Sequence, residues 1–311
     1  MKIQILITLA ATSALITSAT ATVTMEWVTV GNAGNAADTT GFGAVRYEYQ
    51  IGNYEVTNAQ YAEFLNAKAA TDTYSLYNTL SAFVNLGINR SGSSGSYSYS
   101  VTTGMESRPV ALVSWFDAAR FTNWLANGQG AGDTETGSYT LNGAISGIIL
   151  KNAGASIYIP TEDEWYKAAY YNSATSSYSL YPNGQNTITT ADANFAQVIM
   201  ASTDVGSYSG DPSMYGTFDQ GGNVVEWHDT VINGSLRGMR GGGWADNPND
   251  DYLASTPTHT TPGLPSNEGS AIGFRVASVA AIPETSTALF GALGLVCLLR
   301  RKRCLHHQPV K

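Results

Sequence analysis

The stretch Phe218–Trp227, with the sequence FDQGGNVVEW, contains residues whose types and spacing could bind a cation. Asp219 and Glu226 supply carboxylate oxygens near its two ends, and Gly221 and Gly222 allow the backbone to turn its carbonyl groups inward. Several oxygens converging on one point are what a hard cation such as Ca²⁺ requires. An Asx-type turn without an ion uses the same residue types, so the pattern alone leaves both interpretations open.

Thiol chemistry is not expected in the main part of the chain. Both cysteines, Cys297 and Cys304, lie close to the C-terminus of the 311-residue sequence. The residues before them therefore offer no disulfide, no thiolate metal site and no cysteine nucleophile. Two histidines, His228 and His259, lie in the same part, and as isolated loop residues we expect them to be ordinary polar surface.

The N-terminal end has the composition of a targeting segment. Residues 1–21 contain one basic residue, Lys2, followed by an uncharged apolar run that ends in the small residues ATA. This order of features predicts a secretory signal peptide, with a first core helix as the alternative. The residues from about 26 to 280 are then enough for one domain with a substantial core.

The C-terminal segment, residues 282–304, combines Pro283-Glu284, the 15-residue uncharged run Thr285–Leu299 and a basic tail. The run is short for a membrane span, which needs about 20 residues. The segment resembles the PEP-CTERM sorting signal of Gram-negative bacteria. That resemblance implies export through the inner membrane, membrane contact before processing by an exosortase, and a final place at the cell surface, in the outer envelope or in the extracellular matrix. A simple tail anchor is the alternative.

The charge balance argues against nucleic acid as a partner. The formal net charge is −8, although basic residues are concentrated in the C-terminal tail. Binding to phosphates needs a basic surface, which the domain lacks. Only 13% of residues are charged while glycine and tyrosine are abundant, and this composition is typical of loop-rich extracellular proteins. The low-complexity stretches Asn89–Gly104 and Asn127–Ser138 are expected to be surface connections.

Three helix starts can be recognised by reciprocal capping pairs. The pairs are Thr57 with Gln60, Ser114 with Asp117, and Thr161 with Glu164. In each pair the hydroxyl and the side chain three residues later satisfy backbone amides that the helix leaves free. The aromatic residues that follow at helical spacing are interpreted as core packing.

Short strand-like pieces lie between and after these helices: Tyr47–Val56, Ile157–Pro160, Met239–Trp244 and Gly273–Val279. Together with the helices they predict an α+β domain with much irregular structure. Arg240 and Arg275 lie in the last two pieces, and we expect both to pair with buried carboxylates.

Six motifs, in order, are similar to those of the formylglycine-generating enzyme (sulfatase-modifying factor) domain family. They are IGNYEVTNAQYAEFL, RPVALVSWFDAARFTNWL, IYIPTEDEWYKAAYY, YGTFDQGGNVVEWHD, RGMRGGGW and IGFRVAS. The resemblance extends over about Tyr47 to Ala277. It implies the C-type-lectin-like variant of the formylglycine-generating enzyme fold, with a small twisted antiparallel sheet, a few helices and long loops.

The same resemblance implies that the opening stretch is a structural calcium site. Its ligands would be Asp219, Gly222, Val224 and Glu226, the two middle residues acting through their carbonyl groups. Asn223 would brace the turn through its backbone contacts, and Trp227 would fill the core beneath. Asn194 and the carbonyl group of Phe195 match half of a second calcium site of the family, but no acidic partner for them is found near Ser202.

The catalytic chemistry of the family enzymes is not expected here. Those enzymes bind copper through two cysteines near the end of the domain and use it to activate oxygen. The equivalent region here, Asn247–Arg275, contains no cysteine. Hydroxyl and carboxylate groups cannot replace a soft thiolate site without a change of metal and chemistry, so we expect no copper and assign no catalytic residue.

These observations favour a non-catalytic, calcium-stabilised binding module. The loops around Ala245–Ser270 would contact a glycan, a peptide or another matrix component. The domain is rich in Tyr, Ser, Gly and Asn, a composition that suits such recognition. The alternative is an enzyme of the same superfamily with a divergent active site that does not use cysteine.

Overall fold

The computed structural model describes residues 22–83, 85–246, 253–256 and 261–279. The predicted signal peptide, the predicted sorting segment 282–304, both cysteines and His259 lie outside these residues. Within the described ranges no helix is both long enough and apolar enough to cross a membrane.

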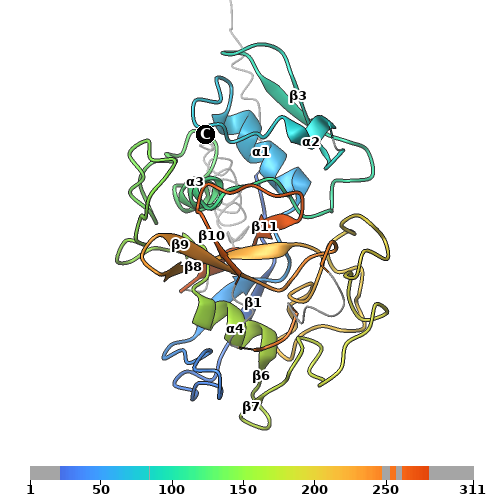
Figure 1. Cartoon of the computed structure of the whole chain (residues 1–311). Helices are drawn as coiled ribbons and strands as arrows, with labels where there is room; N and C mark the ends of the chain where they lie inside the picture. The colour runs from blue at the N-terminus through green and yellow to red at the C-terminus, as the bar shows by residue number, and fades with distance from the viewer. Residues whose placement is uncertain (1–21, 84, 247–252, 257–260, 280–311) are drawn as a thin grey trace, which may run out of the picture.

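The elements are short and separated by long connections (Figure 1). The helices are α1 (Asn58–Lys68), α2 (Leu80–Phe83), α3 (Trp115–Ala126) and α4 (Glu162–Tyr170). The strands are β1 (Trp27–Val30), β2 (Tyr49–Gly52), β3 (Ile88–Ser91), β4 (Ser98–Val101), β5 (Ile157–Tyr158), β6 (Tyr171–Asn172), β7 (Ser177–Tyr178), β8 (Val225–Ile232), β9 (Leu236–Arg240), β10 (Thr261–Gly263), β11 (Ile272–Phe274) and β12 (Ala277–Ser278).

All three predicted capping pairs are confirmed as complete capping boxes. At α1 the hydroxyl of Thr57 accepts the amide of Gln60 at 3.3 Å, while the Thr57 amide donates to Oε1 of Gln60 at 2.9 Å. The same reciprocal bonds begin α3 and α4. Each box satisfies two orphan amides locally, so the start of each helix is fixed by four consecutive residues.

Two four-stranded sheets form the framework. The first has the order β1-β2-β12-β5, with every neighbouring pair antiparallel. The second has the order β10-β9-β8-β11, in which β10, β9 and β8 are antiparallel while β11 lies parallel to β8. The parallel pair aligns Gly273 with Glu226, and it therefore places Arg275, two residues further on, near the Glu226 side chain.

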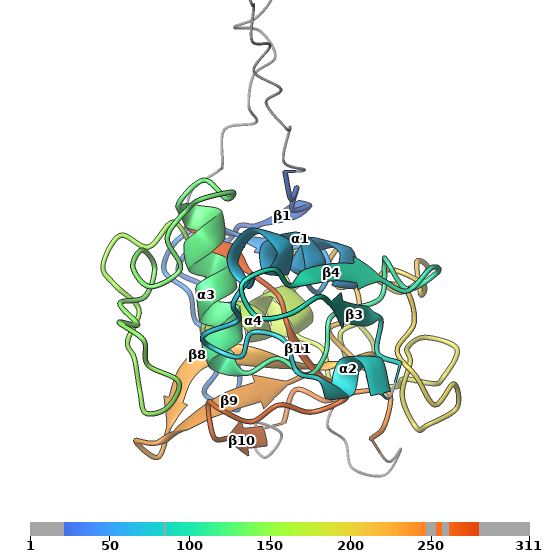
Figure 2. The same cartoon turned by 90° about the horizontal axis from the view of Figure 1, so that it is seen from above.

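Helices cover the second sheet from both sides. In Figure 1, α1 and α3 lie above the β8–β9 hairpin and α4 lies below it. Figure 2 shows α1 and α3 side by side, and their facing rings pack edge to face, with the centroids of Phe64 and Phe121 5.5 Å apart. Trp227 from β8 and Phe274 from β11 are fully buried in the same core. The helix aromatics are thus core residues, as predicted, and the α+β fold with long loops is confirmed.

Two local predictions were wrong. The stretch Asn89–Gly104 was expected to be a surface loop, but it contributes most of the β3–β4 hairpin, in which Ile88 pairs with Val101. Alternate residues of β4 point inward, and Tyr99 is buried with its hydroxyl donating to the carbonyl of Ala69 at 2.8 Å. The strand predicted over Met239–Trp244 in fact ends at Arg240, before the glycines.

Candidate functional site

The predicted calcium stretch leads directly into the longest strand of the second sheet. Asp219 adopts a left-handed backbone with φ 58°, and its Oδ2 accepts the amide of Gly206 at 2.6 Å. Burial raises the pKa of Asp219 to about 6, against the opposing effects of the Gly206 amide and Arg275. Glu226 does not lie in a turn with Asp219, because strand β8 has already begun at Val225.

Glu226 is completely enclosed by hydrogen-bond donors. Its Oε1 accepts Nη2 of Arg275 and its Oε2 accepts Nε of Arg275, both at 2.5 Å. Nε1 of Trp165, from α4, donates to Oε2 at 2.8 Å. Neither side chain of the Glu226–Arg275 pair is exposed to solvent. The expected pairing of Arg275 with a buried carboxylate is therefore confirmed. Both carboxylate oxygens of Glu226 accept hydrogen bonds, and Arg275 supplies the positive charge that balances it.

The turn itself is braced as expected. The amide of Asn223 donates to the carbonyl of Asn194 at 2.8 Å, and Oδ1 of Asn223 accepts the amide of Thr203 at 2.9 Å. Gly222 has φ 93°, and a Cβ atom built on it would meet the Asn194 carbonyl oxygen at 2.4 Å. Glycine is required at this position for both reasons. The structure thus brings Asn194, Gly222 and Asn223 together.

The fit of calcium to this loop can be judged from the oxygen atoms that are not already engaged in hydrogen bonds or ion pairs. Within the described residues, the buried Oδ1 of Asn194 has no hydrogen-bond partner and is available to a cation. The carboxylate of Glu226, in contrast, is already held by a bidentate guanidinium. A ligand set that includes Glu226 therefore fits poorly, and the calcium assignment for Asp219, Gly222, Val224, Glu226 and Asn194 stays a prediction.

A second buried ion pair joins β9, which pairs with β8, to α4. Arg240 pairs with Glu162 at the start of α4, with Nη2 and Oε1 2.6 Å apart, as expected for this arginine.

His228 was expected on the surface, and this prediction was wrong: its side chain is fully buried. The ring occupies the space that Gly238 leaves free, since a Cβ atom there would meet Cε1 of His228 at 1.9 Å. Burial, with Arg240 and Arg237 nearby, lowers the pKa of His228 well below its usual value.

A cavity of about 220 Å³ lies beside Trp244, at the start of the segment where ligand-binding loops were predicted. We call it the Trp244 cavity, and its lining residues are Asn85, Leu86, Met105, Arg108, Met200, Ala201, Ser202, Trp244 and Ser270. Two of the lining residues carry a buried side-chain donor, Nε1 of Trp244 and Nε of Arg108, that has no partner among the described residues. The rim carries Met200, whose side chain is 70% exposed.

The Trp244 cavity combines unpaired N–H groups with apolar surface. A buried donor without a partner costs about 1–3 kcal/mol, which a ligand that brings an acceptor recovers. Leu86, Met105 and Met200 supply contact area for the apolar part of such a ligand. The wall is suited to recognition of an oxygen-rich group such as a carboxylate, a peptide carbonyl or a sugar hydroxyl.

The domain is of the α+β class and of the sulfatase-modifying type. It has small sheets, short capped helices and long connections, and it encloses buried arginine–carboxylate pairs. Residues 18–280 match the family described as sulfatase-modifying factor enzyme 1-like domain, and the chain belongs to this family.

Solved structures show the same fold. CarF is similar over 83% of this chain and 99% of its own, with a TM-score of 0.55 and 24% sequence identity. The Treponema denticola variable protein 1 is similar over 85% of this chain and 98% of its own, with a TM-score of 0.56 and 20% identity. Hercynine oxygenase of Mycobacterium tuberculosis is 30% identical over 115 residues. That match covers 31% of this chain and spans only 27% of the relative's length.

The sequence did not reveal the residues that line the cavities. Arg108 and Trp244 belong to recognised motifs, RPVALVSW and RGMRGGGW, but nothing in either motif shows that the side-chain donors lack partners. Glu55, in the motif YEVT, was not singled out from the sequence, and the structure shows that it is only 1% exposed. Its position directly before the buried residue Val56 was the one available signal.

Proposed function

We propose that this chain is an exported binding protein of its family that recognises an oxygen-rich ligand, a glycan or a peptide, in the Trp244 cavity. The observation that carries the proposal is the pair of buried, unpaired donors on Trp244 and Arg108. Buried polar groups are almost always hydrogen-bonded in native proteins, so two orphan donors on residues that line one cavity favour a bound acceptor. The exposed Met200 at the rim adds apolar contact.

The test is retention of the full chain on glycan and peptide arrays, followed by titration of the strongest hit. Trp244→Phe removes the indole N–H while keeping most of the ring, and Arg108→Met removes the guanidinium while keeping the stem. Each change should weaken binding roughly tenfold, as expected for the loss of one buried hydrogen bond. Arg46→Met, at an exposed arginine, is the matched control and should leave affinity unchanged. Unaltered binding by both cavity variants would refute the proposed site.

We also propose that the protein reaches the cell surface through its two terminal segments. Residues 1–21 would be removed on export, and residues 282–304 would direct the chain to an exosortase. Mass spectrometry of the protein recovered from the envelope of its native host should show an N-terminus near residue 22 and a C-terminus near residue 284. Recovery of the intact chain from the cytoplasm would contradict both assignments.

An oxygenase is the second candidate, because hercynine oxygenase is 30% identical over a part of this chain. The divergent active site would lie in the same cavity and would not use cysteine. Oxygen uptake by the full chain, supplied with iron or with copper and with hercynine, is the assay. Turnover that is lost in Arg108→Met but kept in Arg46→Met would favour the enzyme over the binding module.

A further inference from the structure

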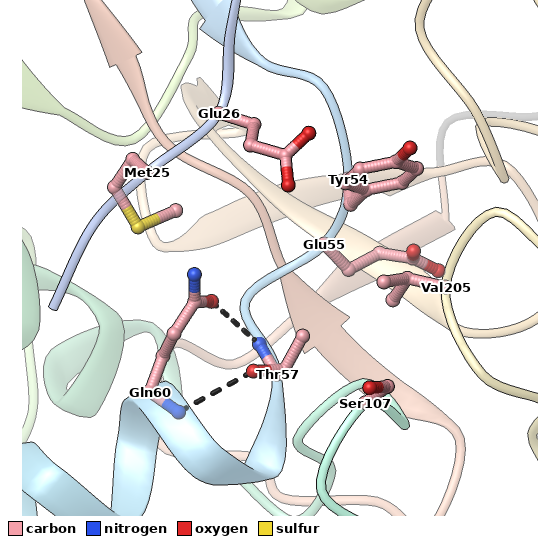
Figure 3. A pocket seen from close by; sticks show the side chains of 8 residues that line it. All are labelled: Met25, Glu26, Tyr54, Glu55, Thr57, Gln60, Ser107 and Val205. Atoms are coloured by element: carbon pink, nitrogen blue, oxygen red, sulfur yellow. Dashed lines mark hydrogen bonds between the residues drawn. The ribbon is translucent and has the colours of Figure 1, made fainter.

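A second cavity, of about 310 Å³, lies between the end of β2 and the start of α1 (Figure 3). We call it the Glu55 cavity, and it is lined by Met25, Glu26, Tyr54, Glu55, Thr57, Gln60, Ser107 and Val205. Its lining residues are distinct from those of the Trp244 cavity. Two of them, Glu26 and Glu55, are carboxylic acids, and none of the described lining residues is basic.

Glu55 is the feature that needs an explanation. Its side chain is 1% exposed, and neither carboxylate oxygen has a hydrogen-bond partner among the described residues. The amide of Glu55 itself lowers the pKa of the carboxyl group, but it does not form a hydrogen bond with it. An isolated buried carboxylate is among the most costly groups that a protein can contain. A group that would satisfy it is therefore to be sought in the cavity that it lines.

The charges around Glu55 make the position still less favourable for an anion. Burial raises the pKa of Glu55 well above its usual value, and the carboxylates of Asp219 and Glu226 raise it further. Arg275 opposes this rise, but both oxygens of Glu226 already accept hydrogen bonds from it. The balance of these effects favours the neutral form of the Glu55 carboxyl group unless a cation pairs with it.

The wall beside Glu55 is rigid. The ring of Tyr54 stacks on Phe218 with centroids 5.5 Å apart and planes 21° from parallel. On another side Gly206 approaches the Tyr54 ring so closely that a Cβ atom would meet Cε1 at 2.7 Å. Opposite Tyr54, Gln60 is held in the capping box with Thr57, drawn as dashed lines in Figure 3. The cavity is thus formed before any ligand arrives, and a preformed site loses little entropy on binding.

We propose that the Glu55 cavity binds a protonated amine, carried by a lysine side chain or by an amino sugar. Glu55 at the buried end would accept the ammonium group, and Glu26, whose side chain is exposed, would attract it at the entrance. The ring of Tyr54 and the side chain of Met25 supply contact for the carbon atoms next to the amine. The volume favours an organic cation over a bare ion, because about 310 Å³ is roughly ten times the share of one water molecule.

The experiment is isothermal titration calorimetry of the full chain with Nα-acetyl-lysine methylamide and with glucosamine. Each amine is paired with its N-acetylated twin, which has nearly the same shape but no charge. We expect at least one amine to bind and both acetylated twins to bind at least tenfold more weakly. The two amines distinguish a peptide source from a sugar source. Equal affinity for an amine and its twin would overturn the proposal.

The matched variants are Glu55→Gln and Glu63→Gln. Both remove one carboxylate, but Glu63 is exposed on α1 and does not line the cavity. Glu55→Gln should weaken amine binding by roughly tenfold or more, the size of a lost charge-assisted hydrogen bond, while Glu63→Gln leaves it within about twofold. Should Glu55→Gln fail to fold, Glu26→Gln at the entrance gives a second test and should weaken binding severalfold. Full affinity in the folded cavity variants would overturn the proposal.

Proton release gives a readout that a merely structural role for Glu55 would not move. We expect amine binding to release a proton from Glu55, so the binding enthalpy should differ between phosphate and Tris buffers at pH 7, and Glu55→Gln should abolish the difference. Titration with CaCl₂ alone covers the inorganic alternative. Calcium binding at Glu55 together with no binding of either amine would replace the proposed ligand by a metal ion.

The two cavities share a wall but can be tested separately. Ser107 and Val205 line the Glu55 cavity, whereas Arg108, the next residue after Ser107, and Ser202, three residues before Val205, line the Trp244 cavity. The two wall segments are joined by a hydrogen bond from the amide of Val205 to the carbonyl of Ser107 at 2.9 Å. Arg108→Met should weaken array binding roughly tenfold without affecting the amine, and Glu55→Gln should weaken amine binding without affecting the arrays. Failure of one proposal is thereby distinguished from failure of the other.

Discussion

The strongest prediction of stability concerns Arg275, which we would replace by methionine. The Glu226–Arg275 pair is completely buried, and Arg275 also donates to the carbonyl groups of Gly52 at 3.1 Å and Phe218 at 2.9 Å. The substitution leaves Glu226 with the indole of Trp165 as its one remaining donor among the described residues. Breaking a buried pair by removing one partner costs about 3–5 kcal/mol.

Chemical and thermal unfolding of the full chain measure this loss. The slope of free energy against denaturant should stay constant while the midpoint falls, because the fold buries the same surface. For a domain of this size, each kcal/mol lowers Tm by about 2–4 °C, so Arg275→Met should lower it by roughly 6–20 °C.

A matched control separates burial from charge. Arg90 pairs with Asp72 at 3.0 Å, but 22% of the Arg90 side chain is exposed and Asp72 keeps the amide of Leu76 as a donor, so Arg90→Met should cost less than Arg275→Met. The double variant Glu226→Gln with Arg275→Met should be more stable than Arg275→Met alone, because it removes the unpaired charge. If Arg275→Met costs no more than Arg90→Met, the reasoning from the buried pair is wrong.

Three further predictions concern pH, the tight turn and calcium. Burial raises the pKa of Asp117 to about 7, so the stability that its proton contributes is lost as pH rises from about 4 through 7. Asp117→Asn should therefore flatten the pH dependence of unfolding in this range, and an unchanged slope would exclude Asp117 as its source. Gly222→Ala should lower stability by at least about 1–3 kcal/mol, whereas Gly210→Ala, where a Cβ meets nothing within 4 Å, should change it by less than about 0.5. Because the Glu226 carboxylate is already paired with Arg275, removal of calcium by EDTA should change Tm by no more than about 2 °C. A fall in Tm of several degrees that is reversed by added CaCl₂ would restore the calcium prediction.

The parts of the fold that the sequence predicted are those with local causes. A capping box is decided within four residues, so Thr57 with Gln60 and its two counterparts could be recognised without knowledge of the rest of the chain. Arg275 could be assigned to a buried carboxylate because it lies in an apolar strand-like motif. The hairpin of β3 and β4 was missed because serine and glycine dominate it, although the alternation SYSYS around Tyr99 is a strand pattern.

The residues of the two cavities were not predictable because their burial depends on distant parts of the chain. Glu55 is enclosed together with Tyr54, whose ring is packed by Phe218 and Gly206 from a connection much further along the sequence. His228 is buried because the neighbouring strand carries glycine at position 238, and only the register of β8 and β9 reveals this. A single sequence names these residues, but it does not show which of them are brought close together by the fold.

The hydrogen bond between Ser107 and Val205 has a practical consequence for how the protein can be altered. The two peptide segments that it joins are a common partition between neighbouring chambers, each with its own chemistry. An insertion or a bulky replacement in either segment displaces atoms on both sides at once. Diversity in one chamber is therefore most easily gained at lining residues outside the partition, such as Glu26 and Ser270, and the partition itself has the least freedom to vary.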